Sequence, residues 1–396
     1  MLQKLFGMKA DRRQALYEAF CALPAFVRSP VLHVACRAGR RHVRGLPTPP
    51  RLIWHVTTRC NARCAHCFHG GRLNGPEEMP ADDFRRVVAS LRVRLRSVTL
   101  TGGEPFLRDD LPALCRILAD VNRTDLVTLP TNGLQPERIA DMLDEILRTA
   151  TTRVNVQVSL DGPPDVHDAL REVPGAFERA ARTVRLLGEM RTRHPRLDQV
   201  AVMTTLSARN QDRLPELVRF VRDDLGAFHK FQWIRGAATD AFGVPAGALG
   251  DLDPLQPDKP GDLPGVLRYV RAEILGRDRS LAARRQVEIL EQGAAILAGH
   301  GPTVRCLAGR VDGVIFADGG VALCEMSRPF ARLADWDFDF FRLWHGPEAR
   351  SMREALSRCH CTHPCNLSTS MAFEPAVLMR LSAPPVPPGA PEPPRP

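Results

Sequence analysis

Residues 52–67 read LIWHVTTRCNARCAHC, a short apolar strand followed at once by three closely spaced cysteines. Thiols this close can wrap a single metal centre from one loop, and in parallel α/β folds the loops that follow strands build the sites. A structural zinc ion usually takes four protein ligands, and His66 and His69 stand nearby as a fourth. Three thiolates can instead hold a [4Fe–4S] cluster and leave one iron without a protein ligand. The spacing alone leaves both interpretations open.

Short β-rich runs alternate with amphipathic helical patterns on both sides of this loop. The expected strands are residues 52–56, 97–100, 126–129, 154–158, 200–204 and 229–234, and the expected helices are 82–95, 111–121, 137–147, 177–190 and 214–221. Six strand–helix units predict a parallel sheet of βαβ crossovers. Because the pattern stops before eight units, the predicted fold class is α/β: a partial (β/α)6 TIM-like barrel with a small cysteine-rich α+β extension at the C-terminal end.

The sequence predicts five segments. They are a basic helical segment at 1–50, the barrel at 51–235, a linker and helices at 236–300, a cysteine-rich domain at 301–375 and a Pro-rich disordered tail at 376–396. Residues 236–262 are rich in Gly, Pro, Ala and Asp, which favours a loop. A β-hairpin is expected at 311–323, turning at Asp318-Gly319-Gly320. Eight of the last thirteen residues are proline, a composition typical of an extended tail.

Composition excludes several classes of protein. The chain has 396 residues, 44% of them hydrophobic and 25% charged, as in globular proteins and unlike disordered chains, collagen or coiled-coil rods. No apolar run reaches the 18 or so residues that a membrane span needs, and the first residues lack the apolar core of a cleavable signal. We therefore expect a cytoplasmic protein whose eleven cysteines stay reduced, so that clustered cysteines indicate metal rather than disulfides.

The positive charge is concentrated at the N-terminal end. Residues 1–50 hold nine Lys or Arg against two acidic residues, whereas the whole chain has a net charge of +9. The remainder is thus nearly neutral, and no nucleic-acid partner is expected. The basic segment also carries apolar residues. Two interpretations stay open: weak contact with a membrane surface, and packing on the barrel, which base rates favour.

The cysteine loop resembles that of the radical S-adenosylmethionine (SAM) enzymes, whose hallmark is Cys-x3-Cys-x2-Cys after the first strand of a partial barrel. Further family landmarks follow in order at the ends of expected strands: Thr101-Gly102-Gly103-Glu104-Pro105, Thr131-Asn132-Gly133, and Ser159-Leu160-Asp161-Gly162 with His167 and Arg171 beyond. Each motif alone is an ordinary turn former. Their register with the βα repeat favours the family. One departure is His66, which stands where the family usually has an aromatic residue.

The resemblance implies a [4Fe–4S] cluster on Cys60, Cys64 and Cys67, with SAM chelating the open iron. Family chemistry then implies reductive cleavage of SAM to methionine and a 5′-deoxyadenosyl radical, which abstracts a hydrogen atom from the substrate. The implied cofactor-binding residues are Gly102, Gly103, Glu104, Pro105, Asn132, Ser159, Asp161 and Arg171. The glycines are expected to let backbone carbonyls approach the SAM ammonium group, and Glu104 to accept a hydrogen bond from it.

A second group of cysteines resembles the SPASM and twitch extensions of these enzymes, which carry auxiliary [4Fe–4S] clusters. Its members are Cys306, Cys324, Cys359, Cys361 and Cys365. Five thiolates suffice for one four-thiolate cluster and not for two. We expect Cys361 to be the spare one, because it lies too near Cys359 for both to bind one cluster comfortably. Zinc is the alternative, with His360 and His363 close by.

Two classes of function follow. The first is a radical SAM enzyme that oxidises or modifies a small molecule or sugar-like substrate, assisted by the auxiliary cluster and served by an electron donor such as flavodoxin or ferredoxin. A peptide maturase of the same superfamily is the alternative, although residues 1–50 are short for a peptide-binding domain. The second class is a non-catalytic iron–sulfur protein, which gives no reason for the motifs at 102–105 and 159–161.

Overall fold

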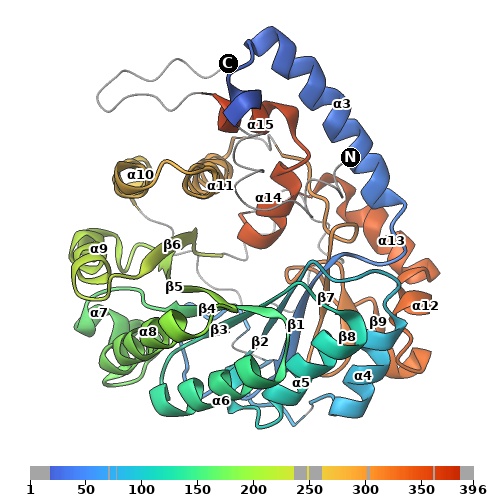
Figure 1. Ribbon diagram of the computed structural model, residues 1–396, viewed down its shortest axis with the longest axis horizontal. Helices are drawn as coiled ribbons and strands as arrows, with labels where there is room; N and C mark the ends of the chain where they lie inside the picture. Colours follow the sequence, from blue (N-terminus) through green and yellow to red (C-terminus); the bar gives the residue numbers. More distant parts are fainter. Residues whose placement is uncertain are drawn as a thin grey trace.

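The computed structural model describes residues 18–69, 72–76, 78–235, 248, 261–300, 304–359 and 362–383. Its centre is a nine-stranded sheet in the order β6-β5-β4-β3-β2-β1-β7-β8-β9 (Figure 1). The strands are β1 Arg51–Thr57, β2 Ser97–Gly102, β3 Leu126–Thr131, β4 Arg153–Ser159, β5 Leu197–Leu206, β6 Phe228–Trp233, β7 Asp312–Ile315, β8 Gly320–Ala322 and β9 Ala331–Arg332. Strands β1 to β6 are parallel neighbours in chain order, and the sheet does not close. The predicted partial (β/α)6 barrel is confirmed.

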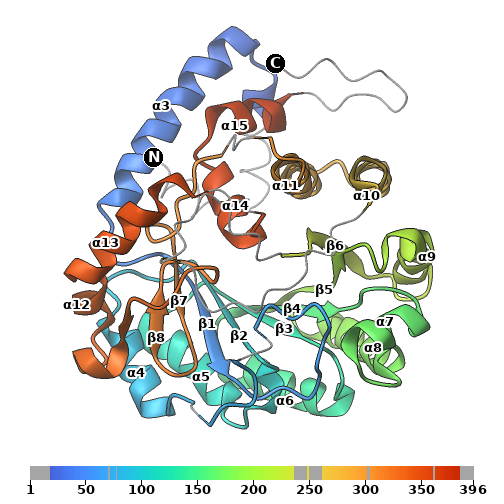
Figure 2. The ribbon, with the colours of Figure 1, turned by 180° about the vertical axis from the view of Figure 1, so that it is seen from behind.

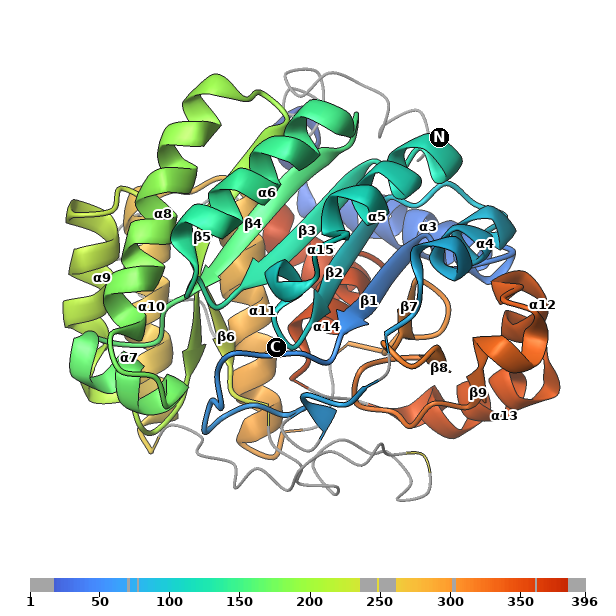
Figure 3. The ribbon, with the colours of Figure 1, turned by 90° about the horizontal axis from the view of Figure 1, so that it is seen from below.

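Helices that follow the strands cover the convex face of the sheet (Figure 3). They are α4 Ala81–Ser90, α5 Leu111–Ile117, α6 Pro136–Thr149, α8 Ala176–Arg193 and α9 Leu214–Asp223. In α6 the buried residues Ile139, Met142, Leu143 and Ile146 recur at the helical spacing, so one stripe meets the strands. A short helix before α8, α7 Pro164–Arg171, was not expected from the sequence.

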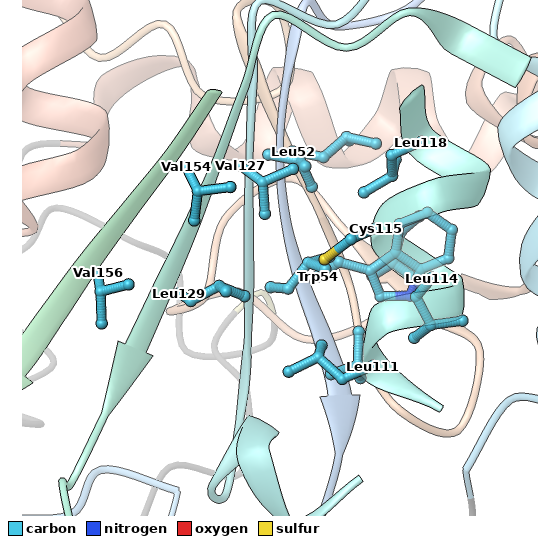
Figure 4. Close-up of a cluster of buried hydrophobic side chains, with 14 of the residues drawn as sticks. Leu52, Trp54, Leu111, Leu114, Cys115, Leu118, Val127, Leu129, Val154 and Val156 are labelled. Atoms are coloured by element: carbon cyan, nitrogen blue, oxygen red, sulfur yellow. The ribbon is translucent and has the colours of Figure 1, made fainter. Parts of the chain in front are cut away.

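Alternation along β1 divides its side chains between the two faces of the sheet. Leu52 and Trp54 belong to the large core between strands and helices, where Trp54 stacks on Phe84 of α4 with ring centroids 4.0 Å apart. Figure 4 shows this core, with Cys115 of α5 beside Trp54. Ile53 packs in a separate cluster on the concave face, and His55 follows it on that face. Strand β1 therefore supplies side chains to the interior of the barrel.

The expected hairpin is present as β7 and β8, with Gly319 in its turn at φ +81°. It does not stand apart from the barrel. Strand β7 pairs in parallel with β1, with Arg51 opposite Asp312 and Trp54 opposite Ile315, so the hairpin extends the central sheet. The cysteine-rich region therefore begins directly beside the strand that leads into the first cysteine loop.

Helices of the C-terminal half span the open side of the barrel between β6 and β7 (Figures 1 and 2). They are α10 Leu263–Arg277, α11 Leu281–Leu297 and α14 Pro364–Met371. Three side-chain hydrogen bonds fix this bridge: Trp233 Nε1 to Leu290 O at 2.7 Å, Arg285 Nη2 to Ser368 O at 2.6 Å, and Thr369 Oγ1 to Asp312 Oδ2 at 2.6 Å. Helices α12 Phe340–Trp344 and α13 Pro347–Ala355 lie outside the hairpin.

The two ends of the described chain lie together. Helix α3, Ala25–Arg44, runs beside α15, Pro375–Ser382, in both ribbon views, and Arg28 Nη1 donates to Ser382 Oγ at 2.9 Å. The prediction of a disordered tail from residue 376 is wrong for its first part. Val377 and Leu381 bury an apolar face beside Met371, which stabilises α15. Residues 384–396, like residues 1–17 and most of the loop expected at 236–262, lie outside the described residues.

Helix α3 packs on α15 while leaving Phe26 and Val34 mostly exposed. Within the described ranges, no helix is both long enough and apolar enough to cross a membrane.

Candidate active site

The first cysteine loop leaves β1 and is held in place by backbone hydrogen bonds. The Cys60 N–H donates to Asn74 Oδ1 at 2.9 Å, and the Ala65 N–H donates to Leu170 O at 2.9 Å. Burial, together with the negative charges of Glu104, Cys64 and Cys67, raises the pKa of Cys60 to about 12. Three thiols crowded into one loop are a donor set that a cationic metal centre would stabilise. The residues present therefore fit a metal centre.

The two glycines at the end of β2, Gly102 and Gly103, let this loop pack against the end of β1. The Gly103 N–H donates to Thr57 O at 3.0 Å, and the Glu104 N–H donates to Arg59 O at 2.8 Å. A Cβ on Gly102, whose φ is +145°, would lie 2.1 Å from Thr57 O, and one on Gly103 would lie 2.2 Å from Arg59 O. The space that the glycines leave is thus filled by the backbone that leads into the cysteine loop, a role that the sequence did not indicate.

Glu104 is buried and ties the loop after β2 to the loop after β3. Its Oε1 accepts hydrogen bonds from Thr131 Oγ1 at 2.9 Å and from the Phe106 N–H at 3.2 Å, and its Oε2 accepts one from the Asn132 N–H at 2.7 Å. Burial raises the pKa of Glu104 to about 7, although these hydrogen bonds oppose the rise. An ionised carboxylate accepts about four hydrogen bonds, so one acceptor position is left for a ligand such as an ammonium group.

Pro105 begins a short 3-10 helix, Pro105–Leu107, directly after Glu104. Asn132 extends the link to the cysteine loop, because its Nδ2 donates to Asn61 Oδ1 at 2.8 Å. Asn61 lies between the first two cysteines and was not among the predicted site residues. The sequence indicates Asn61 only weakly, as a polar residue inside the cysteine motif. The predicted residues 102–105 and 132 are thus brought together with the cysteine loop.

Arg171, at the end of α7, points at the cysteine loop. Its Nη2 donates to Asp161 Oδ2 at 2.5 Å, and its Nη1 lies 3.5 Å from Cys64 Sγ. Asp161 is fully buried and also accepts a hydrogen bond from the Thr205 N–H at 2.9 Å. Burial opposes ionisation, but the positive Arg171 holds the pKa of Asp161 down at about 2. Asp161, predicted as a cofactor-binding residue, therefore contacts Arg171 and positions it beside the thiol.

Two further residues complete the site. Ser159 ends β4 and is half-buried. His66 Nε2 lies 3.7 Å from Asp161 Oδ2, and burial lowers the pKa of His66 to about 4, so the imidazole is neutral near pH 7. This neutral ring stands at the position where the sequence departs from the aromatic residue of the family motif.

The second cysteine group is divided between the two faces of the hairpin. Cys324 and Cys359 are buried in the large convex-face core, and Cys306 packs against the same core. Cys365 packs instead with Ile53 and Phe316 on the concave face. Cys361 and His360 lie outside the described residues.

A partial barrel with these loops at one edge defines a class of protein. Residues 54–221 match the model of the radical SAM superfamily. Two curated relatives match over similar lengths. The pre-heme d1 synthase of Dinoroseobacter shibae is 32% identical over 189 residues, which cover 45% of this chain and 44% of the relative. The mycofactocin maturase MftC of Mycolicibacterium smegmatis is 30% identical over 177 residues, which cover 44% and 42%. The chain thus spans less than half the length of either relative.

A solved structure extends the comparison of folds. Streptococcus suis SuiB, in its complex with the precursor peptide SuiA, superposes with a TM-score of 0.52 at 16% identity and covers 85% of this chain and 74% of SuiB. This likeness concerns the fold alone, and it includes the C-terminal half as well as the barrel.

Proposed function

We propose that the protein is a radical SAM enzyme. The observation that carries this proposal is the convergence on one loop of three thiols, a buried guanidinium aimed at Cys64 Sγ, and the Glu104 loop bonded to Thr57 and Arg59. A non-catalytic iron–sulfur protein would need the thiols alone. The match of residues 54–221 to the radical SAM superfamily supports the same assignment.

In this proposal Cys60, Cys64 and Cys67 hold a [4Fe–4S] cluster. With SAM bound, that cluster supplies one-electron cleavage of SAM and the hydrogen-atom abstraction that follows. Arg171 donates toward Cys64 Sγ and offsets part of the negative charge of the thiolates. Glu104 fixes the position of the loop after β2 and keeps one acceptor position for the ammonium group of SAM.

An auxiliary [4Fe–4S] cluster in the C-terminal region is a second part of the proposal. Cys306, Cys324 and Cys359 share the convex-face core and would supply three of its ligands. The placement of Cys365 on the concave face favours Cys361 as the fourth. This revises the expectation that Cys361 is spare.

The proposed reaction is oxidation or modification of a small molecule or sugar-like substrate in the cytoplasm, with electrons from a donor such as flavodoxin or ferredoxin. Peptide maturation is the alternative, supported by the relative named as a maturase. Each relative matches less than half of this chain, so the names of the relatives alone do not choose between the two reactions. A short peptide encoded beside the gene, if it increases SAM cleavage when added, would favour the alternative.

The test is SAM cleavage by anaerobically reconstituted protein with dithionite. We expect slow formation of 5′-deoxyadenosine without substrate. The triple variant Cys60→Ala/Cys64→Ala/Cys67→Ala should form none, because no thiolate is left to hold the cluster. The matched control is Cys115→Ala, which removes a buried thiol of α5 outside the loop and should stay active. Cleavage that persists in the triple variant would refute the proposed function.

A further inference from the structure

A second cluster of metal-ligating side chains lies on the concave face, apart from the three-cysteine loop. It consists of His55 in β1, His69 shortly after the cysteine loop, and Glu325 shortly after β8. All three are buried, and one nitrogen or oxygen atom from each lies within 4.8 Å of the others. Parallel pairing of β7 with β1 brings Glu325 beside His55, although the two residues are far apart in sequence.

The separations suit a single ion. His55 Nε2 lies 3.3 Å from Glu325 Oε1. Ligand atoms at about 2.1 Å from a tetrahedral zinc ion stand about 3.4 Å from one another. The two imidazole rings are 4.6 Å apart between centroids. Little movement would therefore be needed to place one ion among the three side chains.

The two histidine Nε2 atoms of this cluster are poorly satisfied. His69 Nε2 is buried and has no hydrogen-bond partner among the described residues, and His55 Nε2 has only Glu325 Oε1 beside it, at 3.3 Å. Buried polar side-chain atoms almost always have a partner, and each exception needs an explanation. Since both atoms are imidazole nitrogens beside a carboxylate, a divalent cation would satisfy them together.

The surrounding residues hold the carboxylate in place. His363 Nε2 donates to Glu325 Oε2, and Arg235 Nη1 lies 3.3 Å from the same oxygen. Glu325 Oε2 is thus occupied, while Oε1 faces His55. Residues that orient a ligand in this way are typical of metal sites. The Cys365 thiol lies within the same 4.8 Å limit of Glu325 and His363, so a sulfur atom is also close.

We propose that His55, His69 and Glu325 form a mononuclear site for a divalent metal ion, distinct from the three-cysteine loop and next to Cys365 of the second cysteine group. Two histidines and one carboxylate are the ligand set of catalytic zinc sites and of non-haem iron(II) sites. Three protein ligands leave a coordination position for water or for an oxygen or nitrogen atom of a substrate. The site lies on the same face as Cys365, at the interior of the barrel.

The test measures zinc, which is independent of SAM cleavage. Reconstituted protein is incubated anaerobically with two equivalents of Zn²⁺ and desalted, and zinc and iron are then quantified. The wild type should retain about one zinc ion per chain, with N/O ligands in the zinc K-edge spectrum. His55→Gln/His69→Ala and, separately, Glu325→Gln should lose the zinc and keep the iron. Glu325→Gln retains the shape of the side chain, so loss of zinc in this variant reports the loss of the carboxylate and not a failure to fold.

The control is His229→Gln. His229 is also a barrel histidine, with a buried Nδ1 that lacks a partner among the described side chains, and burial lowers its pKa to about 3. This variant should retain zinc. The proposal is overturned if the wild type retains no zinc, if the double variant and Glu325→Gln retain as much as the wild type, or if the spectrum shows sulfur ligands at about 2.3 Å and the zinc is lost in Cys324→Ser instead.

Discussion

The two cysteine groups of this chain are assembled in opposite ways. Cys60, Cys64 and Cys67 lie in one loop, and that loop is bonded to Asn132, which directly follows β3, and to Arg171 at the end of α7. The second group comes from segments spread over residues 306–365, and its described members lie on both faces of a hairpin. The spacing of the cysteines therefore predicts the first set of ligands. Which cysteines of the second group can lie together depends instead on the fold.

If the two groups hold separate clusters, each can be removed alone. We expect about eight iron atoms per chain in the wild type, twice the four of a single cubane. The triple variant of Cys60, Cys64 and Cys67 should keep about half, still with a [4Fe–4S] spectrum, and Cys324→Ala should lose the other half. Iron analysis and electron paramagnetic resonance measure both. A triple variant that holds zinc and no iron would contradict the auxiliary cluster.

The choice between Cys361 and Cys365 sharpens the comparison within the second group. In the background of the triple variant, Cys365→Ser should keep the remaining iron, because Cys365 packs with Ile53 on the face opposite to Cys324. Cys361→Ser should lose it. The reverse result would mean that the hairpin faces do not decide the ligands, and that Cys361 is the spare residue.

The stability of the region around the first cysteine group should depend on the buried ion pair between Arg171 and Asp161. An exposed ion pair in the same region should contribute much less. Arg171→Ala leaves the fully buried Asp161 carboxylate without its partner, so we expect a loss of about 3–5 kcal/mol in the free energy of unfolding. Urea denaturation of the cluster-free protein measures it. The control is Arg213→Ala, which breaks an exposed pair with Asp165 and should change little. Equal effects would contradict the assigned role of Arg171.

The last prediction concerns pH. The pKa of Glu104 is raised from 4.5 to about 7, so the folded protein holds a proton that the unfolded chain releases above pH 4.5. The free energy of unfolding should therefore fall by about 1.4 kcal/mol per pH unit between pH 4.5 and 7 and level off above 7. Glu104→Gln cannot titrate, so the difference between wild type and variant isolates this slope. A difference independent of pH would contradict the raised pKa.

Local pattern predicted much of this molecule. The six barrel strands were located to within about three residues, because alternation and helical spacing are short-range signals. The roles of single residues within the motifs could not be predicted from the sequence. Position 103 needs glycine because the backbone of Arg59 packs against it, and Asp161 acts through its bond to Arg171. Both are contacts between segments that are distant in sequence.

Long-range pairing lay beyond the sequence. Nothing near residue 312 indicates that β7 will join β1, and that pairing is what brings Glu325 to His55. The helix α15 was missed for a related reason: its apolar face is stabilised by α14, and its Ser382 accepts a hydrogen bond from Arg28 of α3.

The pairing of β1 with β7 also has a consequence for synthesis of the chain. Strand β1 can pair with β2 early, but its other edge stays open until residues 312–315 have left the ribosome. An open edge of a parallel sheet is a template for unwanted strand addition, and the long separation makes its native partner slow to arrive. The strand that carries the first cysteine loop is thus paired on its second side only late in synthesis, so nascent chains that end before the hairpin expose an aggregation-prone edge next to three cysteines.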